Sequence, residues 1–118
     1  MRKFIEHTKN RCVWSWAGLV ATWRSEFSFR SWVWVNLVSA GLALWLPLST
    51  GERALILALG VLVLAAELFN TAIERAVDFI STEKHELARL AKDAGSAGVA
   101  MTAIAAGVAW VVVLVGMV

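Results

Sequence analysis

The chain has 118 residues, of which 59% are hydrophobic, and its formal net charge at pH 7 is +2. Because an ordinary soluble domain is nearer half apolar, this composition favours a membrane protein, and the length allows one domain. The single cysteine, Cys12, excludes an internal disulfide and a multi-cysteine metal site, and the small net charge argues against nucleic-acid binding.

Residues 1–30 are predicted to form an interfacial amphipathic helix. Apolar side chains recur at spacings of three, four and seven and are interleaved with basic residues and further tryptophans: Ile5, Cys12, Trp16, Leu19, Trp23 and Phe27. Tryptophan suits the headgroup region because its ring is apolar and its N–H is polar. We therefore expect this segment to lie along the membrane surface.

Three apolar segments predict transmembrane helices at residues 32–48, 53–74 and 97–118. The last is uncharged over 22 residues, which is enough to cross a hydrocarbon core of about 30 Å. Residues 81–94 are predicted to be a cytoplasmic connection with a capping-box pattern for a helix start at Ser81. The fold class is therefore an all-α membrane protein.

The distribution of Lys and Arg predicts the orientation. Six precede residue 32 and four lie between residues 74 and 96, whereas only Arg53 lies in the loop between the first two spans. The positive-inside rule then predicts a cytoplasmic N-terminus and second connection, and a C-terminus outside. Small residues are dense in the third span, where they allow close helix approach, so we expect subunits to pack together.

Three polar residues of the second span, Glu67, Asn70 and Glu74, fall on one face of its helix with Asp78, which lies one turn further on. A carboxylate at bilayer depth costs about 2.5–3.5 kcal/mol on insertion scales, which predicts a function. Counted from the outer end at 1.5 Å per residue, Glu67 lies roughly 22 Å deep and Glu74 roughly 33 Å deep. The stripe thus runs from the inner half of the bilayer to the cytoplasmic surface.

Three further charged residues, Glu26, Lys92 and Asp93, are expected at the same cytoplasmic depth. Carboxylates without cysteines favour a hard cation such as Mg²⁺, held together with substrate phosphates. A nearby lysine neutralises phosphate charge, and a deeper carboxylate suits a general base. These are the parts of phosphoryl transfer, although spacing alone leaves helix pairing or a solvated face open.

Other classes fit less well. There is no phosphate-binding P-loop motif, and the H-E-x-x-H zinc pattern begun at His85 fails because residue 89 is Arg. A small oligomeric transporter or proton channel would use the stripe as a relay, but residues 54–66 of the same helix are purely apolar. A structural membrane adaptor would tolerate amide substitution throughout the stripe.

The sequence E-L-F-N-T-A-I-E of residues 67–74, with Asp78 and the A-K-D-A-G-S-A of residues 91–97, closely resembles the signature of small bacterial integral-membrane diacylglycerol kinases. Undecaprenol kinases share that fold and remain the alternative, whereas the Gly95-Ser96 pair favours the diacylglycerol branch. The resemblance implies a homotrimer with composite active sites at the cytoplasmic face of the bacterial inner membrane. It also implies MgATP-dependent phosphorylation of a lipid hydroxyl, most directly of diacylglycerol to phosphatidic acid.

The resemblance further implies roles for individual residues. Glu67 matches the catalytic base, and Glu26 and Glu74 match carboxylates that bind Mg²⁺ and ATP. The other residues implied in ATP binding are Trp14, Glu83, His85, Lys92 and Asp93. Those implied in binding the lipid substrate are Arg30, Glu67, Asn70 and Ser96. Asp78 matches a supporting position.

Overall fold

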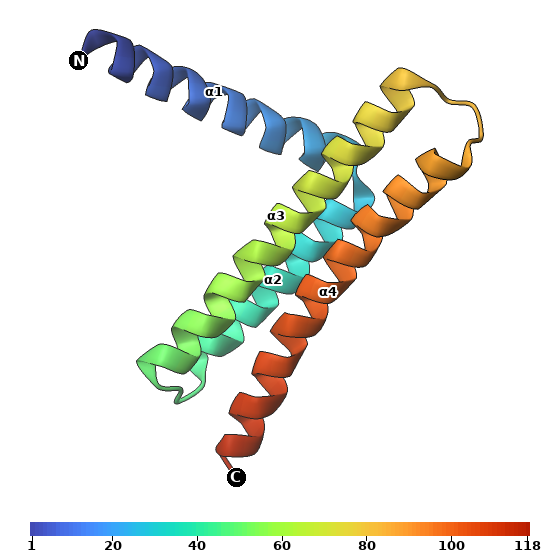
Figure 1. Cartoon of the computed structure of the whole chain (residues 1–118). Coiled ribbons are helices and arrows are strands. Elements are labelled where there is room, and N and C mark those ends of the chain that lie inside the picture. Colours follow the sequence, from blue (N-terminus) through green and yellow to red (C-terminus); the bar gives the residue numbers. More distant parts are fainter.

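The computed structural model describes all 118 residues and consists of four α-helices with no strand. They are α1 (Arg2–Ser25), α2 (Phe27–Trp45), α3 (Thr50–Ile80) and α4 (Glu86–Gly116). Helices α2, α3 and α4 run side by side as a bundle in which α3 contacts both of the others, and α1 projects from it (Figure 1). The all-α prediction is confirmed.

Helices α3 and α4 are each long and apolar enough to cross a membrane. Each has 31 residues, or about 46 Å of helix, so each exceeds a hydrocarbon core of about 30 Å by several turns. Helix α2 has 19 residues and does not reach the same hydropathy, since it includes the polar side chains of Arg30 and Asn36. Two of the three segments expected to span the membrane thus form helices that are long and apolar enough to do so.

The first helix ends five residues earlier than the sequence pattern indicates. Glu26 has an extended backbone, with φ −111° and ψ 110°, and it separates α1 from α2. Arg30 stabilises this joint, because its Nη1 donates to the carbonyl oxygens of Trp23 at 2.6 Å and Arg24 at 3.2 Å. The guanidinium thereby satisfies carbonyls that the end of α1 leaves without helical partners. The chain consequently turns out of the surface helix at Glu26, and residues 27–31 belong to α2.

A second arginine closes the end of α2. Arg53, in the first turn of α3, donates from Nε to the Ala43 carbonyl at 2.8 Å and from Nη2 to the Leu46 carbonyl at 3.2 Å. The same turn contains a capping box, in which the side chains of Ser49 and Glu52 each bond to the other's backbone N–H. The turn between α2 and α3 is thus fixed by polar contacts from both sides.

The helix start expected at Ser81 is wrong. Ser81 instead ends α3, where its N–H donates to the Val77 carbonyl, and α4 begins only at Glu86. The capping box cannot form at Ser81 because the third residue after it is Lys84, which has no carboxylate or amide oxygen to accept from the backbone. His85 caps α4 instead, with its Nδ1 accepting from the Leu87 N–H at 3.0 Å.

Two asparagine–glycine contacts mark the helix crossings. The amide oxygen of Asn36 on α2 lies where a Cβ of Gly60 on α3 would be, and that of Asn70 on α3 lies where a Cβ of Gly95 on α4 would be. The hydrophobic core cluster lies at the opposite end of the bundle from Asn70 and includes Ala43, Leu48, Ile56, Ala109 and Val113. The acidic end of α3 is therefore held by polar contacts rather than by that core.

Candidate active site

Glu67 is the most deeply buried carboxylate of the chain, with 5% of its surface exposed. It lies on the middle part of α3, and its Oε2 accepts a hydrogen bond from the Ser28 hydroxyl of α2 at 3.2 Å. No Lys, Arg or His forms an ion pair with it within the chain. A buried carboxylate without a cation is costly, which makes Glu67 a candidate functional group.

Asn70 and Glu74 follow on the next two turns of α3. The Asn70 amide nitrogen donates to Glu74 Oε1 at 3.4 Å, while its buried amide oxygen faces Gly95 and has no hydrogen-bond partner. Glu74 is half-buried and also has no cation partner in the chain. The stripe therefore presents a second carboxylate whose charge no side chain neutralises.

The C-terminal end of the stripe, at Asp78, is bound to α4 by an ion pair. Lys92 Nζ lies 2.7 Å from Asp78 Oδ1, and the two side chains are 39% and 52% exposed. This contact joins the two helices one turn beyond Glu74. Lys92 is thus held against α3 on the same side of the molecule as the acidic stripe.

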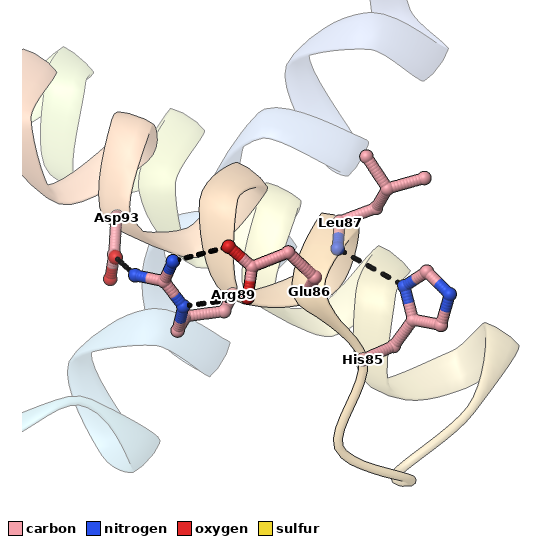
Figure 2. A network of polar contacts seen from close by, with 5 residues as sticks. All are labelled: His85, Glu86, Leu87, Arg89 and Asp93. Atoms are coloured by element: carbon pink, nitrogen blue, oxygen red, sulfur yellow. Dashed lines mark hydrogen bonds and ion pairs between the residues drawn. The ribbon is translucent and has the colours of Figure 1, made fainter.

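Unlike Lys92, Asp93 forms its ion pair within α4. Its Oδ2 accepts from Arg89 Nη1 at 3.0 Å, and Arg89 also pairs with Glu86, so the three form an exposed network along α4 (Figure 2). The hydrogen bond with Glu86, with the charge of Asp93, raises the pKa of Arg89, which stays cationic. No hydrogen bond or ion pair joins Asp93 to Glu26, Glu67 or Glu74 within one chain.

Glu26 occupies the joint between α1 and α2. It is half-buried, and its Oε1 accepts from the Ser25 hydroxyl at 3.4 Å. That hydroxyl also accepts from Arg75 Nη2 on α3 at 2.7 Å, so the joint is connected to the acidic helix. Arg30, expected to contact the lipid, donates to the end of α1 as described above.

The loop between α3 and α4 forms an open pocket of about 620 Å³. Its lining includes three of the residues predicted to bind ATP, Glu83, His85 and Lys92, together with Lys84, Glu86 and Arg89. Three cations in this lining outnumber its two carboxylates, Glu83 and Glu86, and the volume is in the range of small-molecule sites. The pocket therefore brings three of the residues predicted to bind ATP to one end of the bundle.

The remaining predicted residues lie apart within one chain. Trp14 is 66% exposed on α1, which projects from the bundle (Figure 1), and Ser96 is exposed on α4. No group of three or more His, Cys, Asp or Glu side chains is arranged to hold a metal ion. Sequence reasoning gave no role to Ser28 or Arg75, although Ser28 follows Glu26 by only two residues.

Comparison with known proteins gives a consistent result. The family described as prokaryotic diacylglycerol kinase matches residues 13–114. A diacylglycerol kinase of Pseudomonas aeruginosa is 45% identical over 95% of this chain and 91% of its own length. A diacylglycerol kinase of Escherichia coli K12 is 40% identical over 85% of this chain and 82% of its own length. A diacylglycerol kinase of Haemophilus influenzae is 35% identical over 90% of this chain and 90% of its own length.

Proposed function

The chain belongs to the prokaryotic diacylglycerol kinase family, and we propose that Glu67 is the general base of its reaction. The enzyme transfers the γ-phosphoryl group of ATP to the primary hydroxyl of diacylglycerol, which gives phosphatidic acid and ADP. The observation that carries the assignment of Glu67 is the burial of its carboxylate, 5% exposed, without a cation partner.

In the proposed step, Glu67 accepts the proton of the lipid hydroxyl as the hydroxyl oxygen forms a bond to the γ-phosphorus. The bond between that phosphorus and the bridging oxygen of the β-phosphate breaks, and ADP leaves with the electron pair. One carboxylate oxygen of Glu67 accepts from Ser28, so Oε1 is free to accept from the substrate. A buried base also keeps water away from the phosphoryl group, which favours transfer over hydrolysis.

Glu26 and Glu74 are proposed to hold Mg²⁺ with the phosphates of ATP. Both are half-buried, and each carboxylate accepts only one weak hydrogen bond, at 3.4 Å, and no ion pair, so their charge fits a divalent cation. Two protein carboxylates are a usual number when phosphates supply other ligands. Mg²⁺ held by these carboxylates would supply positive charge that stabilises the negative charge on the phosphates during transfer.

Lys92 is proposed to contact the ATP phosphates, with Asp78 as its support. The position of Lys92 beside both the acidic helix and the loop pocket supports this proposal. Asp93, Glu83, His85 and Trp14 are proposed as the other nucleotide contacts. Arg30, Asn70 and Ser96 are proposed to line the lipid site together with Glu67.

We further propose that α2 is a third transmembrane helix and that the active enzyme is a homotrimer in the bacterial inner membrane. The N-terminus and active site would then be cytoplasmic, and the C-terminus outside. Only 12 of 118 residues are buried in one chain, and α1 is almost fully exposed, which supports association with lipid and with other subunits. A site shared between subunits would bring Trp14 to a nucleotide that its own α1 does not reach.

The test is phosphoryl transfer by the purified protein in lipid vesicles. We expect ³²P from [γ-³²P]ATP to appear in phosphatidic acid when diacylglycerol is supplied. Undecaprenol is offered in a separate reaction, and a higher kcat/KM for undecaprenol would refute the assignment of the acceptor.

Replacing Glu67 tests the base. Glu67→Gln keeps the size of the side chain but cannot take a proton at neutral pH, so turnover should be lost, with a fall of about 10²–10⁴-fold typical of general-base removal. MgATP affinity, measured by titration calorimetry, should remain nearly unchanged because the proposed base acts on the lipid hydroxyl and is not among the proposed nucleotide contacts. Equal loss of turnover and MgATP affinity would contradict the role of Glu67.

A further inference from the structure

The hydroxyl group of Ser28 is the one hydroxyl of α1 and α2 that donates a hydrogen bond to a side chain of another helix. Three of the other hydroxyls donate to the carbonyl four residues earlier in their own helix: Thr8 to Phe4, Thr22 to Gly18, and Ser31 to Phe27. Such local bonds are the usual outcome for Ser and Thr within helices. Ser28 donates instead to a side chain on another helix, Glu67 of α3.

The joint at Glu26 explains why the Ser28 hydroxyl does not bond to its own helix. Ser28 is the second residue of α2, so the chain four residues earlier belongs to α1 and does not continue the same helix. The carbonyl at that position, on Arg24, accepts from the guanidinium of Arg30 at 3.2 Å. The Ser28 hydroxyl thus has no local helical acceptor and is free to reach α3.

The contact is also the only one of its kind for Glu67. No other side chain donates to the Glu67 carboxylate within the chain, and its surroundings exclude most solvent. A single hydrogen bond to Oε2 restricts rotation of the carboxylate and leaves Oε1 unengaged. A base must meet its proton within hydrogen-bond distance, so fixing its orientation matters for the rate.

We propose that Ser28 is a positioning residue for this reaction, which orients the Glu67 carboxylate so that Oε1 meets the lipid hydroxyl. The inference rests on the proposed role of Glu67 as the base. Ser28 itself transfers no proton and acts only through Glu67. The extended backbone at Glu26 and the hydrogen bonds of Arg30 to the end of α1 together place the Ser28 hydroxyl beside the Glu67 carboxylate.

The experiment compares Ser28→Thr with Ser28→Val in vesicles that contain diacylglycerol. Thr and Val have nearly the same shape, and only Thr retains the hydroxyl. We expect kcat of the Val variant to be about tenfold lower, as for loss of a hydrogen bond to a charged group, and kcat of the Thr variant to be close to wild type. KM for MgATP and for diacylglycerol should stay within about twofold in both variants, because neither substrate is bound by Ser28.

Ser31→Ala is the matched control, because Ser31 lies one turn along α2 and its hydroxyl bonds only to the backbone at 3.0 Å. Its kcat should equal that of wild type. If Ser28→Val does not assemble, Ser28→Ala takes its place in the comparison with Ser28→Thr.

Equal kcat values for Ser28→Thr and Ser28→Val would overturn the inference. It would also be overturned if Ser28→Val changed kcat and both KM values by similar factors. The outcome for Glu67→Gln separates the two proposals. If that variant is inactive and Ser28→Val is as fast as wild type, only the positioning role fails. If Glu67→Gln retains wild-type turnover, both proposals fail.

Discussion

Replacing Lys92 with methionine should weaken MgATP binding far more than it weakens the fold. The ion pair of Lys92 with Asp78 is short, at 2.7 Å, but its side chains are 39% and 52% exposed. Exposed pairs of this kind contribute about 0–1 kcal/mol to the free energy of unfolding, so Lys92→Met should lower it by no more than that. A charge-assisted hydrogen bond to phosphate is worth about 1.5–3 kcal/mol, which corresponds to roughly a 10- to 100-fold increase in KM for MgATP.

The assay measures steady-state phosphorylation with MgATP varied at saturating diacylglycerol, together with thermal unfolding of the same preparations. Asp78→Asn is the control, because it removes the ion pair and leaves Lys92 in place. This variant should lose a similar, small amount of stability while KM for MgATP rises less than about threefold. The reasoning is refuted if Lys92→Met leaves KM unchanged, or if Asp78→Asn raises KM as much as Lys92→Met does.

Two other substitutions test the second carboxylate and the crossing of α3 with α4. Glu74→Gln removes a half-buried charge without a cation partner, so the Mg²⁺ concentration for half-maximal activity should rise about tenfold, and an unaltered magnesium dependence would count against its role. Gly95→Ala places a Cβ on the Asn70 amide oxygen and should destabilise the protein by about 1–3 kcal/mol in chemical unfolding. Gly98→Ala, where no atom lies within 4 Å, should be neutral or stabilise by up to about 1 kcal/mol, and equal stability of the two alanine variants would contradict the crossing.

The long helices were predictable because their signal is local. Uninterrupted apolar runs identified α3 and α4, and the acidic stripe on α3 followed from helical spacing alone. The joint at Glu26 was not predictable in this way, because neither glycine nor proline marks it. Its stabilising contact comes from Arg30, whose guanidinium bonds to the backbone seven residues earlier, at Trp23.

The environment of the candidate site was predictable only in part. Depth along α3 predicts that Glu67 is in the inner half of the bilayer, and this needs only the rise of a helix. The partner of Glu67 depends on how α2 packs against α3, since Ser28 is 39 residues away in the sequence. Likewise, the adjacent residues Lys92 and Asp93 suggested one cluster, whereas Lys92 pairs with Asp78 of α3 and Asp93 pairs with Arg89 of its own helix.

The asparagine–glycine contacts have a consequence for how the helices find their relative positions. Lipid solvates an apolar helix equally well wherever it slides along its neighbour, so apolar surface alone does not fix the vertical alignment. Asn36 fits against Gly60, and Asn70 against Gly95, because these positions lack a side chain. A shift of four residues along the partner helix would press the Asn36 amide against Ile56 or Leu64, and the Asn70 amide against Ala91 or Val99. The two contacts therefore favour one position of α2 and one position of α4 along the axis of α3.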